Sequence, residues 1–231
     1  MGVTLNVAVL SDLGLLRPNN EDAAHGGHRL IAVADGIGGG PAGEVASRAA
    51  ITAIASADGG GELRQAFTDA NAAIRRAARD NPALEGMGTT LTTIQFTARG
   101  EAVLGHIGDS RAYRSREGRL SRLTRDDTYV QSLVDEGLID SEQARHHPQK
   151  SLITRSLQGL EFTATFTDLH TRSGDRYLLC SDGLSDIVTD ESIEDAINAG
   201  DDPGACAKSL VRLALQAGAP DNVTVVVAFL D

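Results

Sequence analysis

The feature that most limits how this chain can fold is the placement of its aspartates. Three apolar, strand-like runs end at an aspartate next to a glycine, and a fourth aspartate stands just before another such run. These positions are Asp35-Gly36, Gly108-Asp109, Asp182-Gly183 and Asp221. Carboxylates at strand ends converge if the strands share a sheet, and converging carboxylates repel one another unless a cation lies among them. The pattern therefore predicts a cation site. Asp-Gly is also common turn chemistry, which explains any single position better than it explains all of them together.

The candidate ligands indicate which cation would bind. All are oxygen donors, and an early turn, Asn20-Glu21-Asp22, adds two further carboxylates. Oxygen ligands select hard ions such as Mg²⁺ or Mn²⁺. A neighbouring glycine lets the backbone approach closely, so that a carbonyl oxygen can also coordinate. The histidines are scattered apart from His146-His147, and adjacent residues rarely point at one ion, so a zinc hydrolase is disfavoured.

The hydrophobic periodicity indicates strand-rich blocks separated by pairs of helices. Strands are expected at 3–10, 29–34, 89–97, 102–107, 111–114, 162–166, 176–180 and 223–230. Helices are expected at 41–56, 62–79, 127–137, 191–198 and 204–216. Because regular βαβ alternation is missing, this order favours α+β layers. Without a repeat or a low-complexity linker, residues 1–231 are expected to form one domain, with a surface flap at about 127–158.

The charge balance excludes some classes of partner. The chain carries 21 basic and 32 acidic residues, a net charge of −11, which argues against nucleic-acid binding. A phosphorylated substrate would also be repelled, unless the site holds a local source of positive charge. No stretch approaches the roughly 18–20 apolar residues of a membrane span. Residues 1–16 lack the pattern of a signal peptide, and two cysteines make no disulfide framework, so a cytoplasmic protein is expected.

Six motifs stand in a fixed order along the chain. They are Arg17-Pro18-Asn19-Asn20-Glu21-Asp22, Asp35-Gly36-Ile37-Gly38-Gly39, Gly88-Thr89-Thr90, Gly108-Asp109-Ser110-Arg111, Ser181-Asp182-Gly183 and Asp221-Asn222. In this order they resemble the motifs of the metal-dependent protein phosphatases of type 2C. The resemblance runs from about residue 10 to the C-terminus and is close to the short bacterial members that consist of the catalytic domain alone. It implies an αββα sandwich, in which two antiparallel sheets are flanked by helices.

The resemblance also implies a set of metal ligands. Asp35 would bridge two core ions, Mn²⁺ or Mg²⁺, and the carbonyl of Gly36 would bind one of them. Asp182 and Asp221 would complete the other ion's ligands. Asp109, together with Asp182, would hold a third and weaker ion.

Three further residues receive catalytic roles from the resemblance. Arg17 would grip the substrate phosphate through its planar guanidinium. Glu21 and Asp22 would orient metal-bound waters. The reaction implied is hydrolysis of phosphoserine or phosphothreonine by a metal-activated water at a binuclear centre, without a phosphoenzyme.

The implied partners are phosphorylated proteins, among them a bacterial serine/threonine kinase and its targets, and a monomer is expected. Two alternatives remain open. One is a pseudophosphatase that binds phosphoproteins without turnover, and the other is a phosphatase dedicated to one regulatory protein in a partner-switching system. The chain also departs from the family at the general acid. Eukaryotic members carry a histidine at the position of Ile37, and bacterial members often carry one at the position of Gly40, so the residue that protonates the leaving group is not identified.

Two other phosphate-related patterns fit poorly. Gly38-x-Gly40-x-x-Gly43 matches a dinucleotide fingerprint, but no parallel βαβ series follows it. Cys206 to Arg212 has the C-x5-R spacing of cysteine phosphatases, but it lies inside an amphipathic helical segment without glycine. Cys206 is therefore expected in the core.

Overall fold

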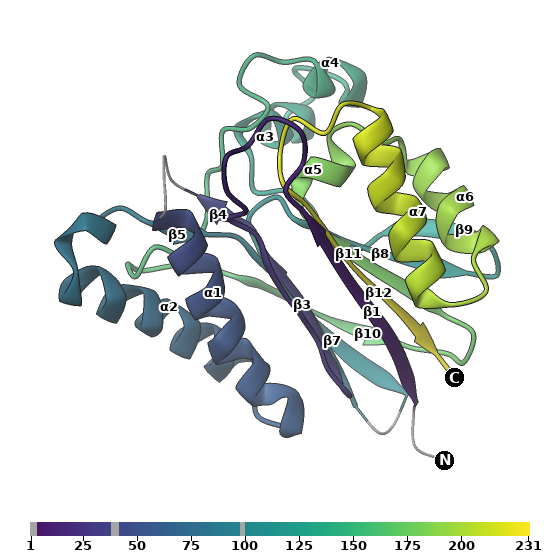
Figure 1. Ribbon diagram of the computed structural model, residues 1–231, viewed down its shortest axis with the longest axis horizontal. Helices are drawn as coiled ribbons and strands as arrows, with labels where there is room; N and C mark the ends of the chain where they lie inside the picture. Colours follow the sequence, from purple (N-terminus) through teal and green to yellow (C-terminus); the bar gives the residue numbers. More distant parts are fainter. Residues whose placement is uncertain (1–3, 38–41, 98–99) are drawn as a thin grey trace.

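Two five-stranded antiparallel sheets lie face to face in the computed structural model, which describes residues 4–37, 42–97 and 100–231 (Figure 1). The first sheet runs, in spatial order, β1 (Leu5–Asp12), β12 (Val223–Leu230), β11 (Arg176–Cys180), β8 (Arg111–Arg116) and β9 (Arg119–Arg122). The second sheet runs β10 (Thr165–His170), β7 (Glu101–Ile107), β6 (Leu91–Phe96), β3 (Leu30–Ala34) and β2 (Ala23–Gly26). A short ribbon of β4 (Gly36–Ile37) and β5 (Gly88–Thr89) extends beyond β3.

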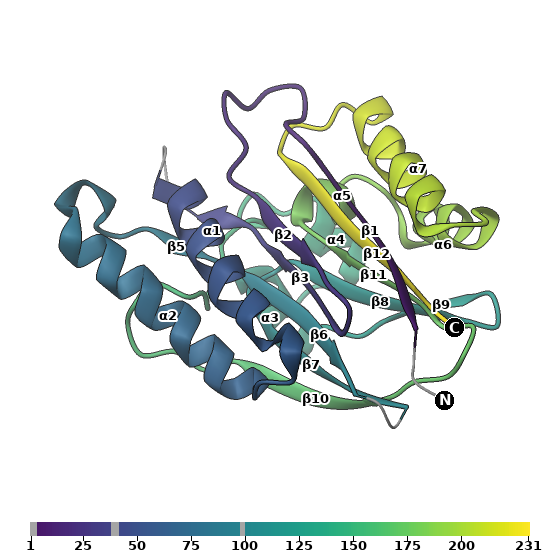
Figure 2. The ribbon, with the colours of Figure 1, turned by 60° about the horizontal axis from the view of Figure 1, so that its bottom comes forward.

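Helices cover the outer face of each sheet. The second sheet carries α1 (Ala42–Ala55) and α2 (Leu63–Asp80). The 3₁₀ turn η1 (Ser56–Gly59) follows α1, and η2 (Pro82–Leu84) follows α2. The first sheet carries α5 (Asp182–Ser185), α6 (Asp190–Ala199) and α7 (Pro203–Gln216). Figure 2 shows the two helical layers on opposite sides of the molecule. The expected αββα sandwich is confirmed. No helix in the described ranges is long and apolar enough to cross a membrane.

Three apolar clusters hold these layers together. One lies between the sheets and includes Ile31, Tyr177 and Val226, and the others lie between each sheet and its helices. Strand β3 is buried along its whole length because it faces the opposite sheet on one side and α1 on the other. An all-apolar strand without alternation is what burial on both faces requires. The catalytic candidates therefore stand on strands whose positions the core fixes.

Some element boundaries differ from the sequence-based expectation. The strand expected at 162–166 was wrong, since β10 starts at Thr165 and Phe162 packs outside it against the α1–α2 layer. The strand expected at 89–97 is divided at Thr90, whose N–H donates to the carbonyl of Asp35 instead of joining the ladder. The helix expected at 127–137 is the shorter α3 (Tyr129–Asp135), and α4 (Ser141–Arg145) follows it. The edge strands β2 and β9 and the short helix α5 were missed.

Candidate functional site

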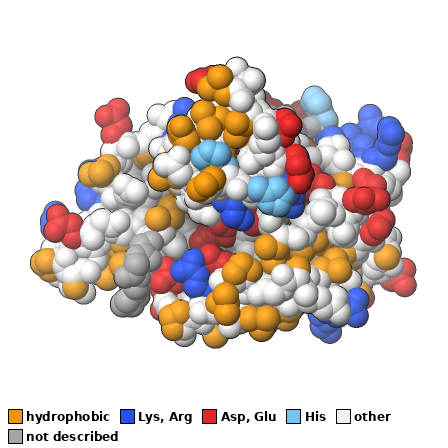
Figure 3. Space-filling view, turned by 90° about the horizontal axis from the view of Figure 1, so that it is seen from above, with side chains coloured by type: hydrophobic (Ala, Val, Ile, Leu, Met, Phe, Trp, Pro, Cys, Tyr) orange, Lys and Arg blue, Asp and Glu red, His pale blue; other side chains and the backbone are white. Residues whose placement is uncertain are grey.

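The four aspartates that end or precede apolar strands lie at one edge of the sandwich. Asp35 follows β3, and Asp109 follows β7 after Gly108. Asp182 begins α5, two residues after β11, and Asp221 precedes β12. Because β3 and β7 belong to the second sheet and β11 and β12 to the first, the group bridges the two sheets. Figure 3 looks onto this edge and shows acidic side chains deep in the middle of the face.

The proton affinities of these carboxyl groups reflect their crowding. The pKa of Asp35 is raised well above its usual value, first by removal of its carboxyl group from water and then by the negative charges around it. Those charges belong to Asp22, Asp182, Asp109 and Asp221. The same causes raise the pKa of Asp182 to about 7 and that of Asp22 to about 6. Burial and the Asp182 charge raise the pKa of Asp109 as well. The structure thus brings together the carboxylates that the sequence singled out.

Two of these buried carboxyl groups have an oxygen without a hydrogen-bond donor. Asp22 Oδ1 and Asp109 Oδ1 have no partner in the described part of the chain. Buried acceptors are normally paired, and an all-oxygen set with free acceptors fits a hard cation such as Mg²⁺ or Mn²⁺. Among the described residues, no three His, Cys, Asp or Glu side chains already form a complete ligand set. The carboxylates are therefore gathered at one place without being arranged around one point.

Thr90 joins two of the strand ends that carry the site. Its hydroxyl accepts a hydrogen bond from the N–H of Asp35 (2.9 Å) and contacts the hydroxyl of Ser110 at 2.7 Å. Gly108 lies against Thr90, where a Cβ would come within 2.6 Å, and its φ of +108° also favours glycine. The sequence pattern marked Gly88-Thr89-Thr90 as a motif without a role. The structure shows that Thr90 fixes the backbone of Asp35 relative to that of Asp109.

Glu21 and Asp22 lie at the end of the loop that leads from β1 in the first sheet to β2 in the second. Asp22 accepts a hydrogen bond from Ser181 Oγ (2.8 Å), which ties it to the residue before Asp182. The carboxylate of Glu21 lies at the first turn of α1, so close to Gly43 that a Cβ there would come within 2.2 Å of Oε2. A helix N-terminus favours a negative charge. Both residues therefore border the aspartate group.

Arg17 pairs with one of the candidate ligands. Its Nη2 donates to Asp221 Oδ2 at 2.6 Å, and half of the arginine side chain is exposed. Asp221, Glu21 and Asp182 all raise the pKa of this guanidinium. The arginine predicted to grip phosphate therefore lies at the rim of the carboxylate group, where it supplies positive charge in an acidic protein.

Asn222, which the sequence analysis named without assigning it a role, holds the β1–β2 loop in place. Its Nδ2 donates to the carbonyls of Leu13 (2.8 Å) and Asn19 (3.0 Å), and its Oδ1 accepts from the N–H of Glu21 (2.9 Å). One buried side chain thus fastens both ends of the segment that carries Arg17. The only sequence signal was its place beside Asp221.

We expect Asn222→Ala to lower the free energy of unfolding by about 2–4 kcal/mol, because three partly buried backbone groups lose their partner. It should also weaken Mn²⁺ binding, since the loop that carries Arg17 and Glu21 would no longer be fixed beside Asp221. Calorimetric titration with Mn²⁺ and thermal melting measure the two effects. The matched control is Asn198→Ala, which removes hydrogen bonds to Ser115 and Gly118 far from the site. Weakened Mn²⁺ binding in both variants, or in neither, would contradict this role.

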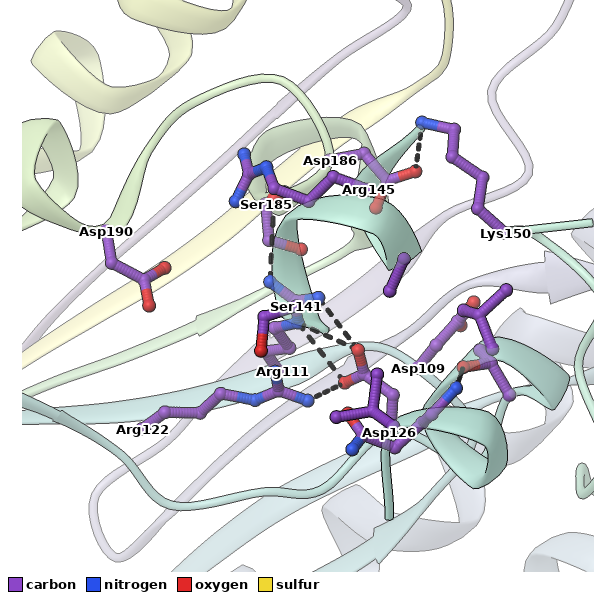
Figure 4. Close-up of a pocket in the computed structure, with 15 residues that line it drawn as sticks. Asp109, Arg111, Arg122, Asp126, Ser141, Arg145, Lys150, Ser185, Asp186 and Asp190 are labelled. Atoms are coloured by element: carbon purple, nitrogen blue, oxygen red, sulfur yellow. Dashed lines mark hydrogen bonds and ion pairs between the residues drawn. The ribbon is translucent and has the colours of Figure 1, made fainter. Parts of the chain in front are cut away.

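A polar cavity of about 210 Å³ lies beside Asp109, bounded by α3, α4 and α5. Figure 4 shows Arg111 and Arg122 converging on Asp126 in its wall. Arg111 donates to Asp126 from both Nε and Nη2, and neither side chain is more than slightly exposed. Such a two-pronged pair holds a fixed geometry. Arg111 of the fourth motif thus serves to hold the wall of the cavity.

Residues 127–158 form the segment expected to be a flap. It is joined to the rest of the molecule by the ion pair of Lys150 with Asp186 (2.8 Å), and by Asp127, whose N–H donates to the carbonyl of Gly108 (2.7 Å). Within the segment, Arg155 Nη1 lies 3.4 Å from Asp127 Oδ1. The segment therefore stands over the cavity beside Asp109.

The competing patterns receive no support from the geometry. Cys206 and Arg212 lie in α7, and Cys206 is buried against the carbonyl of Ile197. His146 contacts Glu142 at the surface and belongs to no metal-binding group in the described residues. Gly38 and Gly40 lie outside the described residues.

Comparison with known proteins gives the family. A model of the family described as "Protein phosphatase 2C" matches residues 18–213. The chain belongs to the protein phosphatase 2C family. Among its members, the serine/threonine protein phosphatase PstP of Mycobacterium tuberculosis is 52% identical over 233 residues. That match covers 98% of this chain but 45% of PstP, so the chain spans about half the length of this relative.

Two further matches, to one other relative and to the isolated catalytic domain of PstP, cover nearly the whole of both chains compared. The protein phosphatase PhpP of Streptococcus pneumoniae is 34% identical, and the match covers 98% of each chain. A crystal structure of the catalytic domain of PstP in complex with two manganese ions superposes with a TM-score of 0.92. It is 48% identical, and the match covers 99% of each chain. The sheets and helices described above are thus the fold of this family.

Proposed function

We propose that this protein is a metal-dependent phosphatase that hydrolyses phosphoserine and phosphothreonine in other proteins. The observation that carries the proposal is the convergence of Asp35, Asp109, Asp182 and Asp221 at one edge, where burial and neighbouring carboxylates raise the pKa of the first three. Crowded, buried carboxylates repel one another, and a bound cation offsets that repulsion. The names of the relatives, serine/threonine protein phosphatase PstP and protein phosphatase PhpP, support the reaction class.

Five groups would hold the metal ions. Asp35 would bridge two Mn²⁺ or Mg²⁺ ions, the Gly36 carbonyl would bind one, and Asp182 and Asp221 would bind the other. Asp109 with Asp182 would hold a third ion. When bound, these ions supply a water of lowered pKa and offset the charge of the phosphoryl oxygens. The two manganese ions in the PstP structure support the number of core ions.

The other candidate residues act on the substrate and on water. The exposed guanidinium of Arg17 would bind two phosphoryl oxygens through parallel N–H donors, which orients the phosphorus atom. It would also stabilise charge on those oxygens in the transition state. Glu21 and Asp22 would accept hydrogen bonds from water at the carboxylate edge and so position it for attack.

The proposal also covers the domain organisation, the compartment, the oligomeric state and the substrates. Residues 1–231 would act as one phosphatase domain with a flap at 127–158, working as a cytoplasmic monomer. Its substrates would be phosphorylated proteins, including a serine/threonine kinase and the targets of that kinase. The two cysteines are buried and unpaired, which suits a reducing compartment.

Phosphate release from a phosphothreonine peptide tests the proposal. We expect turnover with Mn²⁺ or Mg²⁺ and none with EDTA, restored when metal is added back. A protein that binds the peptide with every metal but never releases phosphate would be a pseudophosphatase, and the proposal would be wrong. A protein that hydrolyses one regulatory phosphoprotein and no peptide would be a dedicated partner-switching enzyme.

The flap gives a separate expectation. Replacing residues 127–158 should change the preference among phosphopeptides and spare the hydrolysis of para-nitrophenyl phosphate, because the small ester does not extend to the flap. The measurement is kcat/KM for two peptides and the ester. Equal loss of all three activities would contradict a role in substrate choice.

A further inference from the structure

Three leucines next to the phosphate-gripping arginine are unusually exposed. Leu13, Leu15 and Leu16 are 41%, 60% and 74% exposed and directly precede Arg17. They account for three of the eight large hydrophobic side chains that are exposed in the described part of the chain. Single exposed leucines need no explanation, but a contiguous apolar group beside a functional site indicates contact with a partner. We call these three side chains the apolar ridge.

The backbone that carries the apolar ridge is fastened to the carboxylate edge. The N–H of Leu15 donates to the carbonyl of Ala219 (2.9 Å), and Asn222 binds the carbonyl of Leu13. Gly14, with φ +74°, packs so closely on the backbone of Asp221 that a Cβ would come within 2.1 Å of its carbonyl oxygen. Figures 1 and 2 both show the β1–β2 loop standing beside the start of β12. The apolar ridge is therefore held at a fixed place relative to Asp221 and Arg17.

We propose that the apolar ridge docks an apolar side chain of the phosphoprotein, close in sequence to the phosphorylated serine or threonine. The inference rests on the proposed function, because it takes Arg17 as the phosphate contact. Leu16 is bonded to Arg17, and an extended peptide advances about 3.3–3.6 Å per residue. A substrate whose phosphate lies on Arg17 therefore has its neighbours, within about three positions, above Leu15 and Leu16.

The chemistry of the apolar ridge argues for an apolar occupant. Residues 13–16 carry no charge and no polar side chain, within a protein of net charge −11. An acidic flanking residue would meet leucine side chains and the surrounding negative field, whereas an apolar side chain would remove both itself and Leu16 from water. Because the backbone is already fixed, docking costs little conformational entropy in the enzyme.

Phosphothreonine peptides with a glycine–serine background test the proposal. One leucine, or one aspartate, is placed at each of the three positions before and after the phosphothreonine, and kcat/KM is measured with Mn²⁺. The wild type should prefer the best leucine peptide to the plain peptide by about tenfold, mainly through KM, because burying one leucine is worth at least that factor. Leu16→Ser should reduce the preference to less than about twofold.

The matched control is Leu160→Ser, whose side chain is 67% exposed and lies outside the β1–β2 loop. It should keep the wild-type preference. The proposal is overturned if the wild type shows no preference for leucine, or if Leu16→Ser keeps that preference. It is also overturned if Leu16→Ser alters the oligomeric state on gel filtration instead of peptide choice, since a second copy would then be the occupant. If no peptide is hydrolysed, the proposed function fails, and calorimetric affinities for the same peptides bearing a non-hydrolysable phosphonate decide the role of the apolar ridge.

Discussion

Asp35→Asn is expected to lower Mn²⁺-dependent hydrolysis of a phosphothreonine peptide by about a thousandfold or more. Burial and the negative charges of four other aspartates raise the pKa of Asp35. Asp35 would bridge the two core ions. The amide side chain keeps the size of the aspartate but has one acceptor oxygen and no charge. The variant should therefore lose Mn²⁺ affinity as well as turnover, and calorimetric titration measures that loss directly.

The folded state should tolerate the same substitution. The N–H of Asp35 donates to Thr90 and its carbonyl accepts from Thr89, so the main-chain contacts do not depend on the carboxylate. Without metal, the variant should melt no lower than the wild type, because one repelled charge has been removed. Asp168→Asn on the edge strand β10 is the control and should leave both Mn²⁺ affinity and turnover unchanged. Full activity in Asp35→Asn would contradict the bridging role.

The metal-free protein is expected to lose thermal stability as the pH rises from 5.5 to 8, and Mn²⁺ should restore it. The pKa of Asp22 is raised to about 6 and that of Asp182 to about 7, both above the value of about 3.9 for an unfolded aspartate. A raised pKa means that the folded state binds protons that the unfolded state releases. The resulting stability is present below about pH 4 and is lost as the pH passes through 6 and 7.

The loss should amount to about 2–4 kcal/mol, or a fall in Tm of about 5–10 °C. Mn²⁺ at about one hundred times its Kd should return about 2.7 kcal/mol. Melting curves at pH 5.5 and pH 8, each with EDTA and with Mn²⁺, give the four Tm values to be compared. Asp182→Asn should flatten the pH dependence of the metal-free protein, raise its Tm at pH 8 and weaken the response to Mn²⁺. A metal-free Tm that rises with pH in wild type and variant alike would show that the carboxylate group does not govern this stability.

The convergence of the four aspartates at one edge could be predicted from the sequence because three of them are marked twice. Asp35 and Asp182 each follow an apolar run and stand next to a glycine, and these local signals survive folding because the core fixes the strands. The same runs indicated α+β layers, and the resemblance of the motifs to a known family implied the αββα sandwich. The edge strands β2 and β9 carried no such signal, because short and partly polar edges are shaped by their neighbours more than by their own residues.

The contacts that complete the site could not be predicted because they join distant parts of the chain. Arg17 and Asp221 are 204 residues apart, and Asn222 reaches back to Leu13 and Asn19. The pairing of β1 with β12, with Asp12 opposite Val223, brings these segments together. A motif can therefore name Asn222 without revealing that it fastens the loop that carries Arg17 and the apolar ridge.

The central claim is that the carboxylate edge is a metal centre, and anomalous diffraction from crystals grown with Mn²⁺ tests it most directly. We predict two strong manganese peaks that share Asp35, each about 2.0–2.4 Å from its oxygen ligands. One should contact the Gly36 carbonyl, and the other should contact Asp182 and Asp221, with Arg17 released from Asp221. A crystal of active protein that shows no manganese beside Asp35 would contradict the account.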